Sequence, residues 1–77
     1  MKKLSNITIA EFRSALKALG AVYDRTKGGH ESWKKEGLNR TIVFQTHKDP
    51  IPEFVVKNAL RDLGISREDF LELIEKI

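Results

Sequence analysis

A pair of glycines followed by a histidine is the part of this sequence best suited to chemistry. Gly28 and Gly29 can take the positive φ angles of a tight hairpin turn at little steric cost, and His30 follows at the start of the next extended segment. An imidazole has a pKa near ~6.5 in water and can therefore accept and return a proton at neutral pH. The segment predicts either an acid–base site or an ordinary exposed turn beside a solvated histidine.

Lysines on both sides of this histidine indicate what such chemistry acts on. Lys27 precedes the glycines, and Lys34 and Lys35 lie at the end of the following segment. Positive side chains at these positions can hold a phosphate group beside an imidazole. A proton-transferring group next to a bound phosphate suggests chemistry on nucleic acid.

The charge is unevenly distributed along the chain. The net charge is +3, and residues 1–50 carry ten Lys or Arg against five Asp or Glu, whereas residues 51–77 carry four against six. A basic surface attracts a polyanion such as RNA, or an acidic protein, without giving sequence specificity to either. The first two thirds of the chain should therefore hold the binding surface.

Length and composition limit the remaining possibilities. We expect residues 1–77 to form a single small domain with one core and one surface site. The sequence has no cysteine, and two histidines without a third ligand are a poor zinc set, so neither a metal nor another cofactor is expected. No apolar run is long enough for a signal peptide or a membrane span, which predicts a cytoplasmic protein with no membrane contact.

Three helices are predicted from capping residues and apolar spacing. Thr-Ile-Ala-Glu at 8–11 is a capping box, and apolar residues at helical spacing follow it, so the first helix is expected at about 8–19. Proline suits the first position of a second helix at about 52–63. Ser66 starts a third helix, in which Ile77 is expected on the apolar side.

Three extended segments lie between the first and second helices. They cover 21–25, 31–35 and 40–46, are rich in β-branched and aromatic residues, and are separated by turn residues. This pattern predicts an antiparallel meander. Strand alternation places His30 and Trp33 on opposite faces, so a Trp33 in the core would leave His30 in solvent. The first residue of a strand is often twisted out of register, so the sequence leaves the point open.

The order α-β-β-β-α-α predicts an α+β fold with helices against one face of a three-stranded antiparallel sheet. The first five elements have the order of the double-stranded-RNA-binding domain. Such domains recognise A-form RNA by its shape, its 2′-hydroxyls and its phosphates rather than by base sequence.

The sequence resembles the HicA toxins, small ribonucleases of bacterial and archaeal toxin–antitoxin pairs. The matching features are Gly-Gly-His at 28–30, the aromatic Trp33, a strand that closes on His47, and Leu-Gly-Ile-Ser at 63–66 followed by an acidic amphipathic helix. Together they cover nearly the whole chain from the first helix onward.

The resemblance implies an mRNA interferase with a fold like that of double-stranded-RNA-binding domains. It also implies that His30 is needed for cleavage and that a HicB antitoxin covers it. Many members have Gly-Ser before this histidine and a second histidine or a basic residue after it, where this chain has Gly29 and Glu31. If the Glu31 carboxylate lies on the same face of the sheet as His30, it repels phosphate. The alternative is that it points to the opposite face.

The mechanism expected from the residues needs no metal ion. His30 removes the proton of an RNA 2′-hydroxyl, the oxygen attacks the neighbouring phosphorus, and a 2′,3′-cyclic phosphate forms. His47 is a candidate for the general acid or for a phosphate contact, and Trp33 either packs in the core or stacks on a base. The residues expected to contact RNA are Lys27, Gly28, Gly29, Lys34, Arg40, His47, Lys48 and Lys57.

Two other functions fit the same residues. The first is a non-catalytic RNA-binding module, in which the basic hairpin grips the backbone and His30 is one more contact. The second is a protein-interaction domain whose positive charge serves an acidic partner.

Overall fold

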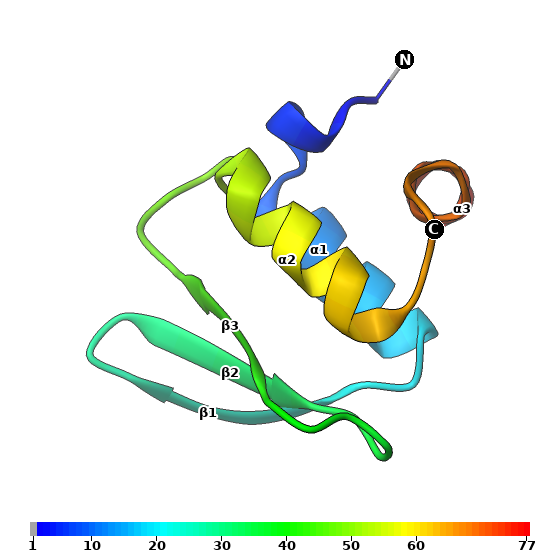
Figure 1. Ribbon diagram of the computed structural model, residues 1–77. Coiled ribbons are helices and arrows are strands. Elements are labelled where there is room, and N and C mark those ends of the chain that lie inside the picture. Colours follow the sequence, from blue (N-terminus) through cyan, green and yellow to red (C-terminus); the bar gives the residue numbers. More distant parts are fainter. Residues whose placement is uncertain (1) are drawn as a thin grey trace.

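The computed structural model describes residues 2–77, with a three-stranded antiparallel sheet on one side and helices on the other (Figure 1). Strand β2 lies between β1 and β3. The α+β class, the order of elements and the likeness to a double-stranded-RNA-binding domain are thereby confirmed. The elements are a 3-10 turn Leu4–Asn6, α1 Ile9–Ala18, β1 Val22–Lys27, β2 His30–Lys34, β3 Ile42–Gln45, α2 Glu53–Leu63 and α3 Arg67–Lys76.

The helices begin and end where the sequence provides capping residues. The Thr8 hydroxyl accepts a hydrogen bond from the Glu11 N–H at 3.1 Å, and the Glu11 carboxylate accepts one from the Thr8 N–H at 2.9 Å, which is the predicted capping box. Pro52 occupies the N-cap of α2 rather than its first turn, and Gly64 ends that helix with a φ of 70°. Ser66 caps α3 with its hydroxyl, as predicted.

The first hairpin is tighter than the sequence patterns indicate. Gly28 and Gly29 alone form the loop, with φ angles of 58° and 81°, and Lys27 pairs directly with His30. Two positive φ angles are what a type I′ turn requires, and only two residues are then needed to reverse the chain. Strand β1 therefore continues to Lys27 instead of ending at Arg25, and β2 starts at the histidine itself.

The third strand is shorter than predicted. It covers only Ile42–Gln45, which pair with Trp33 back to His30 in β2, and the bond from the Thr46 N–H to the Gly29 carbonyl lies outside this regular ladder. Its alternation is as expected, with Ile42 and Phe44 buried. The neighbouring Val43 lies on the opposite, exposed face of the sheet.

Phe12 is the centre of the core. Its ring meets Phe44 of β3 edge to face, with centroids 5.2 Å apart, and Phe70 of α3 at 6.3 Å. Trp33 is only 2% exposed, so it packs in the core and cannot stack on a base. Other fully buried side chains are Ile7, Leu16, Ile51 and Val56. These contacts join all three helices to the inner face of the sheet.

The last residue of the chain lies outside the core. The prediction for Ile77 is wrong, because α3 ends at Lys76 and the last residue is 53% exposed, beyond the apolar stripe that closes with Ile74. Within residues 2–77, none of the helices combines the length and apolar character needed to cross a membrane.

Candidate active site around His30

His30 faces solvent on the outer face of the sheet. In the ladder it stands in one row with Lys27 of β1 and Gln45 of β3. Because successive side chains of a strand alternate, His30 lies opposite to Trp33, which is buried on the helix side. The question that the sequence left open is settled in favour of an exposed imidazole.

The backbone before His30 is fixed to the chain beyond β3. The Gly29 carbonyl accepts two hydrogen bonds from Thr46, from its N–H at 2.8 Å and from its hydroxyl at 3.2 Å. These bonds extend the pairing of β2 and β3 beyond the regular ladder. The glycine turn is therefore held in place on both sides, which limits the positions that the imidazole can reach.

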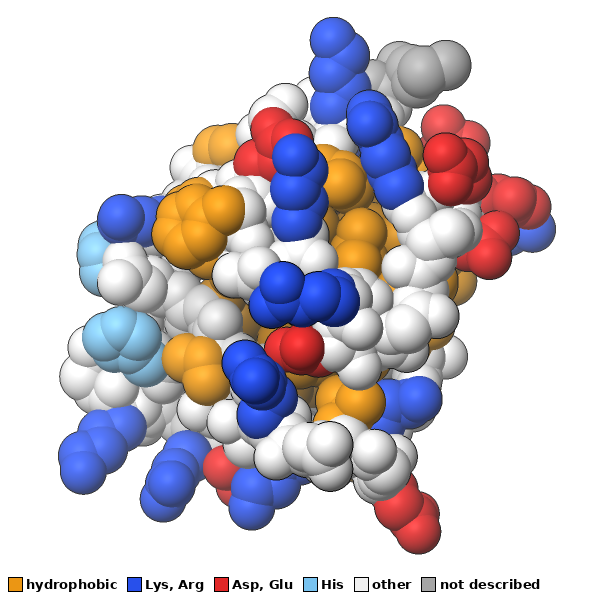
Figure 2. Space-filling view, viewed as in Figure 1, with side chains coloured by type: hydrophobic (Ala, Val, Ile, Leu, Met, Phe, Trp, Pro, Cys, Tyr) orange, Lys and Arg blue, Asp and Glu red, His pale blue; other side chains and the backbone are white. Residues whose placement is uncertain are grey.

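His47 packs against the same glycine. A methyl group added to Gly29 would lie 3.7 Å from His47 Nδ1, and its φ of 81° would strain any larger residue there. Figure 2 shows the two histidine side chains near each other along one edge of the molecule. A role for His47 in proton transfer beside His30 stays a prediction.

Glu31 points away from His30 and into the core. Its side chain is 4% exposed and accepts hydrogen bonds from Arg13 Nε at 3.0 Å and from Arg13 Nη2 at 2.6 Å. The Trp33 indole N–H donates to the same carboxylate at 2.7 Å. The residue that departs from the family pattern therefore carries its charge on the inner face of the sheet, bound by three donor groups.

These hydrogen bonds keep Glu31 ionised. The bonds from Arg13 hold the pKa of the Glu31 carboxyl below its usual range, although burial acts in the opposite direction, and the Trp33 N–H adds to the lowering. The same bonds raise the pKa of Arg13. The negative charge is thus neutralised inside the protein and does not face a phosphate on the outer surface.

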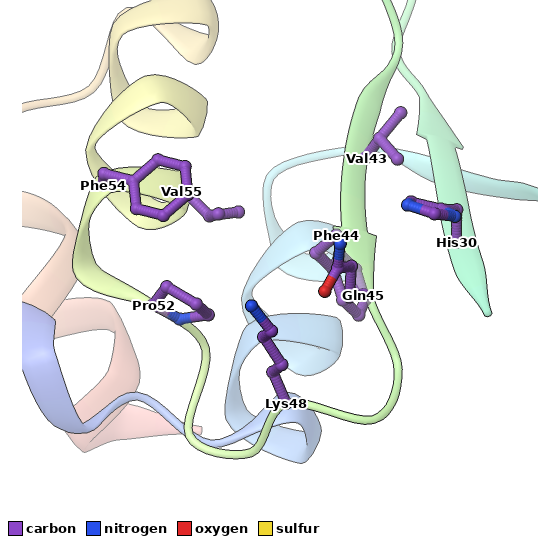
Figure 3. Close-up of a pocket in the computed structure, with 8 residues that line it drawn as sticks. All are labelled: His30, Val43, Phe44, Gln45, Lys48, Pro52, Phe54 and Val55. Carbon is purple, nitrogen blue, oxygen red and sulfur yellow. The ribbon is translucent and has the colours of Figure 1, made fainter.

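A cavity of about 190 Å³ opens beside His30 (Figure 3). In the figure, His30 reaches from β2 toward β3, and Lys48 extends into the space between β3 and the start of α2. The other lining residues are Val43, Phe44 and Gln45 of β3, with Pro52, Phe54 and Val55 at the start of α2. An imidazole and an ammonium group therefore share one hollow with an apolar wall.

The remaining predicted contacts are spread more widely. Lys27 is exposed beside His30 in the ladder row. Lys34 lies at the other end of β2, with its ammonium 3.5 Å from an Asp24 carboxylate oxygen. Lys57 pairs with Glu53 at 2.9 Å on α2 and does not line the cavity beside His30.

Arg40 lines a second hollow of about 270 Å³ that continues the first. The two hollows share Val43, Phe54 and Val55, so together they form one groove between β3 and α2. Among residues 2–77, no group of three or more His, Asp or Glu side chains is arranged to hold a metal ion.

Residues 9–65 match the family model described as the HicA toxin of bacterial toxin–antitoxin systems. The chain belongs to the HicA toxin family. The match runs from the start of α1 to just beyond α2 and includes the glycine turn, His30 and both walls of the groove. A search of curated proteins found no matching relative.

Several residues that line the cavity in this HicA-family protein were not expected from the sequence, among them Gln45 and Phe54. Gln45 and Phe54 line the cavity, but Gln45 reads only as an alternating strand residue. Phe54 lies outside the apolar stripe of α2 and is 66% exposed. The only sequence signal for a binding role of Phe54 was its type and position, a large aromatic residue in the first turn of a helix but outside the buried stripe. The partnership of Arg13 with Glu31 was also missed, because it joins two elements distant in sequence.

We expect Arg13→Ala to destabilise the protein by about 3 kcal/mol, since it leaves the buried Glu31 charge without its cation. Glu31→Gln should cost less, about 1.5 kcal/mol, because Arg13 is 45% exposed and its charge can be solvated. Urea unfolding gives both values. Arg25→Ala, an exposed arginine with a loose ion pair to Asp24, is the control and should change stability by no more than about 0.5 kcal/mol. Equal effects of Arg13→Ala and Arg25→Ala would contradict this account.

The lowered pKa of Glu31 also predicts a pH dependence. Below about pH 4.3, the ordinary pKa of a glutamate, the unfolded chain takes up a proton at this position while the folded protein does not. The free energy of unfolding should therefore fall as the pH falls from that value through the lowered pKa. Glu31→Gln lacks this contribution, so the stability of the variant should decrease less over the same range. If the free energy of unfolding changed with pH in the same way in both proteins, Glu31 would not be the source of this pH dependence.

Proposed function

We propose that this HicA-family protein cuts mRNA without a metal ion, with His30 as the catalytic base, and that a HicB-type antitoxin covers His30 in the inactive pair. The observation that carries the proposal is the exposed His30 beside a cavity that also holds Lys48, while the neighbouring Glu31 is turned into the core. Membership of a toxin–antitoxin family supports the biological role. The proposed site of action is the cytoplasm, where mRNA is translated.

In the proposed reaction, His30 takes the proton from the 2′-hydroxyl of the nucleotide before the cut. The 2′-oxygen bonds to the adjacent phosphorus, and the bond from phosphorus to the 5′-oxygen of the next nucleotide breaks. The products are a 2′,3′-cyclic phosphate and a 5′-hydroxyl, which receives a proton. One positioned base gives a rate factor of roughly 10² to 10⁴. His47, which packs on Gly29, is the candidate that supplies the proton to the leaving oxygen.

Positive charge on the outer face would stabilise the pentavalent phosphate. Lys27 and Lys48 are the lysines nearest to His30 by ladder position and by cavity lining. Preorganised donors aimed at a developing negative charge contribute most where water is partly excluded, as in the cavity beside His30. Gly28 and Gly29 carry no side chain, so an RNA backbone can approach the turn closely.

The outlying cations would hold the RNA away from the cut. Lys34 and Lys57 each have an acidic neighbour, and exposed pairs of this kind are weak enough to exchange for a phosphate. Arg40, in the second hollow, extends the positive surface along the groove. These residues would set the affinity and its dependence on salt, rather than the rate of the chemical step.

Replacement of the 2′-hydroxyl by hydrogen at the cleaved position should abolish cutting there, because the attacking oxygen is then missing. The measurement is gel analysis of a labelled RNA after incubation with the purified protein in EDTA. The unmodified RNA is the control and should give a 2′,3′-cyclic end. Continued cutting of the 2′-deoxy position would rule out internal attack, and loss of cutting in EDTA would rule out a reaction without metal.

His30→Ala should lower the rate of RNA cleavage by about 10² or more, with little change in thermal stability, because the side chain is exposed. In cells the variant should no longer arrest growth. Arg67→Ala, at the exposed start of α3, provides a control that keeps wild-type activity. Undiminished mRNA cleavage by His30→Ala would remove this residue from the active site. RNA binding without cleavage by the wild type would favour a non-catalytic module.

A further inference from the structure

The cavity beside His30 has an apolar wall that the fold does not use. Phe54 is 66% exposed and Val43 is 42% exposed, although both are large apolar side chains. Both line the cavity, Phe54 from α2 and Val43 from β3 (Figure 3). Neither belongs to the buried core, so their apolar surfaces are free to contact a ligand.

The same cavity contains an unsatisfied hydrogen-bond acceptor. Gln45 Oε1 is buried and has no hydrogen-bond partner among residues 2–77, and Gln45 lines the cavity. A buried polar atom without a partner is unfavourable, and in native proteins such atoms are rare. Because the oxygen has almost no accessible surface, a ligand N–H group in the cavity would satisfy it after the Gln45 amide turns toward the cavity.

We propose that the cavity binds one unpaired nucleobase of the RNA, next to the phosphate that His30 attacks. The base stacks on Phe54 and donates a hydrogen bond to Gln45 Oε1. This inference rests on the proposed function and names its substrate more closely as single-stranded RNA. It also assigns Gln45 Oε1 as the acceptor for an N–H group on the Watson–Crick edge of that base, which is an exocyclic amino group in adenine and cytosine, a ring N–H in uracil and either of the two in guanine.

Size and surroundings favour a base over other occupants. The volume of about 190 Å³ is below the range of pockets for drug-sized molecules, so the cavity suits a single flat group. Lys48 at one end of the groove and Arg40 in the second hollow place positive charge on both sides of Phe54. An aromatic residue between cations is the arrangement by which proteins bind single-stranded nucleic acid. In a duplex the base faces are stacked inside and cannot enter.

The second hollow gives the strand a continuous path. It shares Val43, Phe54 and Val55 with the first, and Asn58 and Asp62 of α2 contribute polar groups there. Phe54 therefore lines both hollows. An aromatic residue in this position can stack between two successive bases of a strand. We expect the backbone to pass from Lys48 along β3 toward Arg40.

The test measures binding without cleavage. A short fluorescent RNA with fluorine in place of every 2′-hydroxyl cannot be cut by internal attack, so its affinity for the wild type can be determined by anisotropy. Phe54→Ala should weaken binding by roughly 5- to 150-fold, the measured range for removing one stacking aromatic. Ile77→Ala removes another exposed apolar side chain, one that lies outside the groove, and should leave the affinity unchanged. Annealing the complementary strand should weaken binding to the wild type.

A second arm tests the role of Gln45. Wild-type protein should bind a uridine-only strand more tightly than the same strand made of N3-methyluridine, which lacks the Watson–Crick N–H donor. Gln45→Met keeps the length of the side chain but removes the acceptor, and should reduce this ratio toward one. A ratio that is the same in both proteins would overturn the assignment of Gln45.

The outcomes separate this inference from the proposed function. Wild-type affinity in Phe54→Ala, or equal affinity for the duplex and the single strand, would overturn the base pocket even if cleavage is observed. Unchanged RNA affinity in Phe54→Ala combined with weaker binding of a HicB-type antitoxin would mean that the cavity receives a protein side chain instead. Failure of wild-type protein to cut unmodified RNA would reject the catalytic proposal and leave the binding result intact.

Discussion

The ion pair between Arg13 and Glu31 is the constraint on which the two faces of the sheet depend. A carboxylate on the central strand, one residue from the exposed histidine, is costly in the interior unless donors surround it. Arg13 of α1 and the Trp33 indole supply those donors, and each comes from a different element of the core. The pair therefore fixes how β2 lies against α1, and strand alternation then places His30 on the outer face.

The outer face is assembled from short-range features that act together. The two-residue glycine loop starts β2 at His30, and Thr46 binds the Gly29 carbonyl with both its N–H and its hydroxyl. His47 follows immediately and packs on the same glycine. Each of these features is local, yet together they bring both histidines of the chain to one edge. A small fold can in this way position two titratable groups without a deep cleft.

How much was predictable depends on the distance over which each interaction acts. The capping box of Thr8, the caps at Ser66 and Gly64 and the glycine turn are encoded within a few neighbouring residues. The elements and the position of His30 directly after the turn could therefore be inferred, but not the face of the sheet on which it lies. The direction of Glu31 could not, because it is decided by Arg13, which is 18 residues away in the sequence. The end of β3 likewise depends on where its partner strand stops.

The groove between β3 and α2 was the least predictable part of the site, for a physical reason. Its walls come from an edge strand and from the first turn of a helix, joined by a connector whose course no local pattern determines. Phe54 and Gln45 have no role in folding that periodicity detects. Phe54 lies off the buried stripe, and the Gln45 oxygen has no partner among residues 2–77. An exposed aromatic ring costs a fold little, whereas a buried acceptor without a partner costs about 1–3 kcal/mol. Their occurrence together beside His30 fits the proposed nucleobase ligand, because departures from the rules of folding are expected at functional sites.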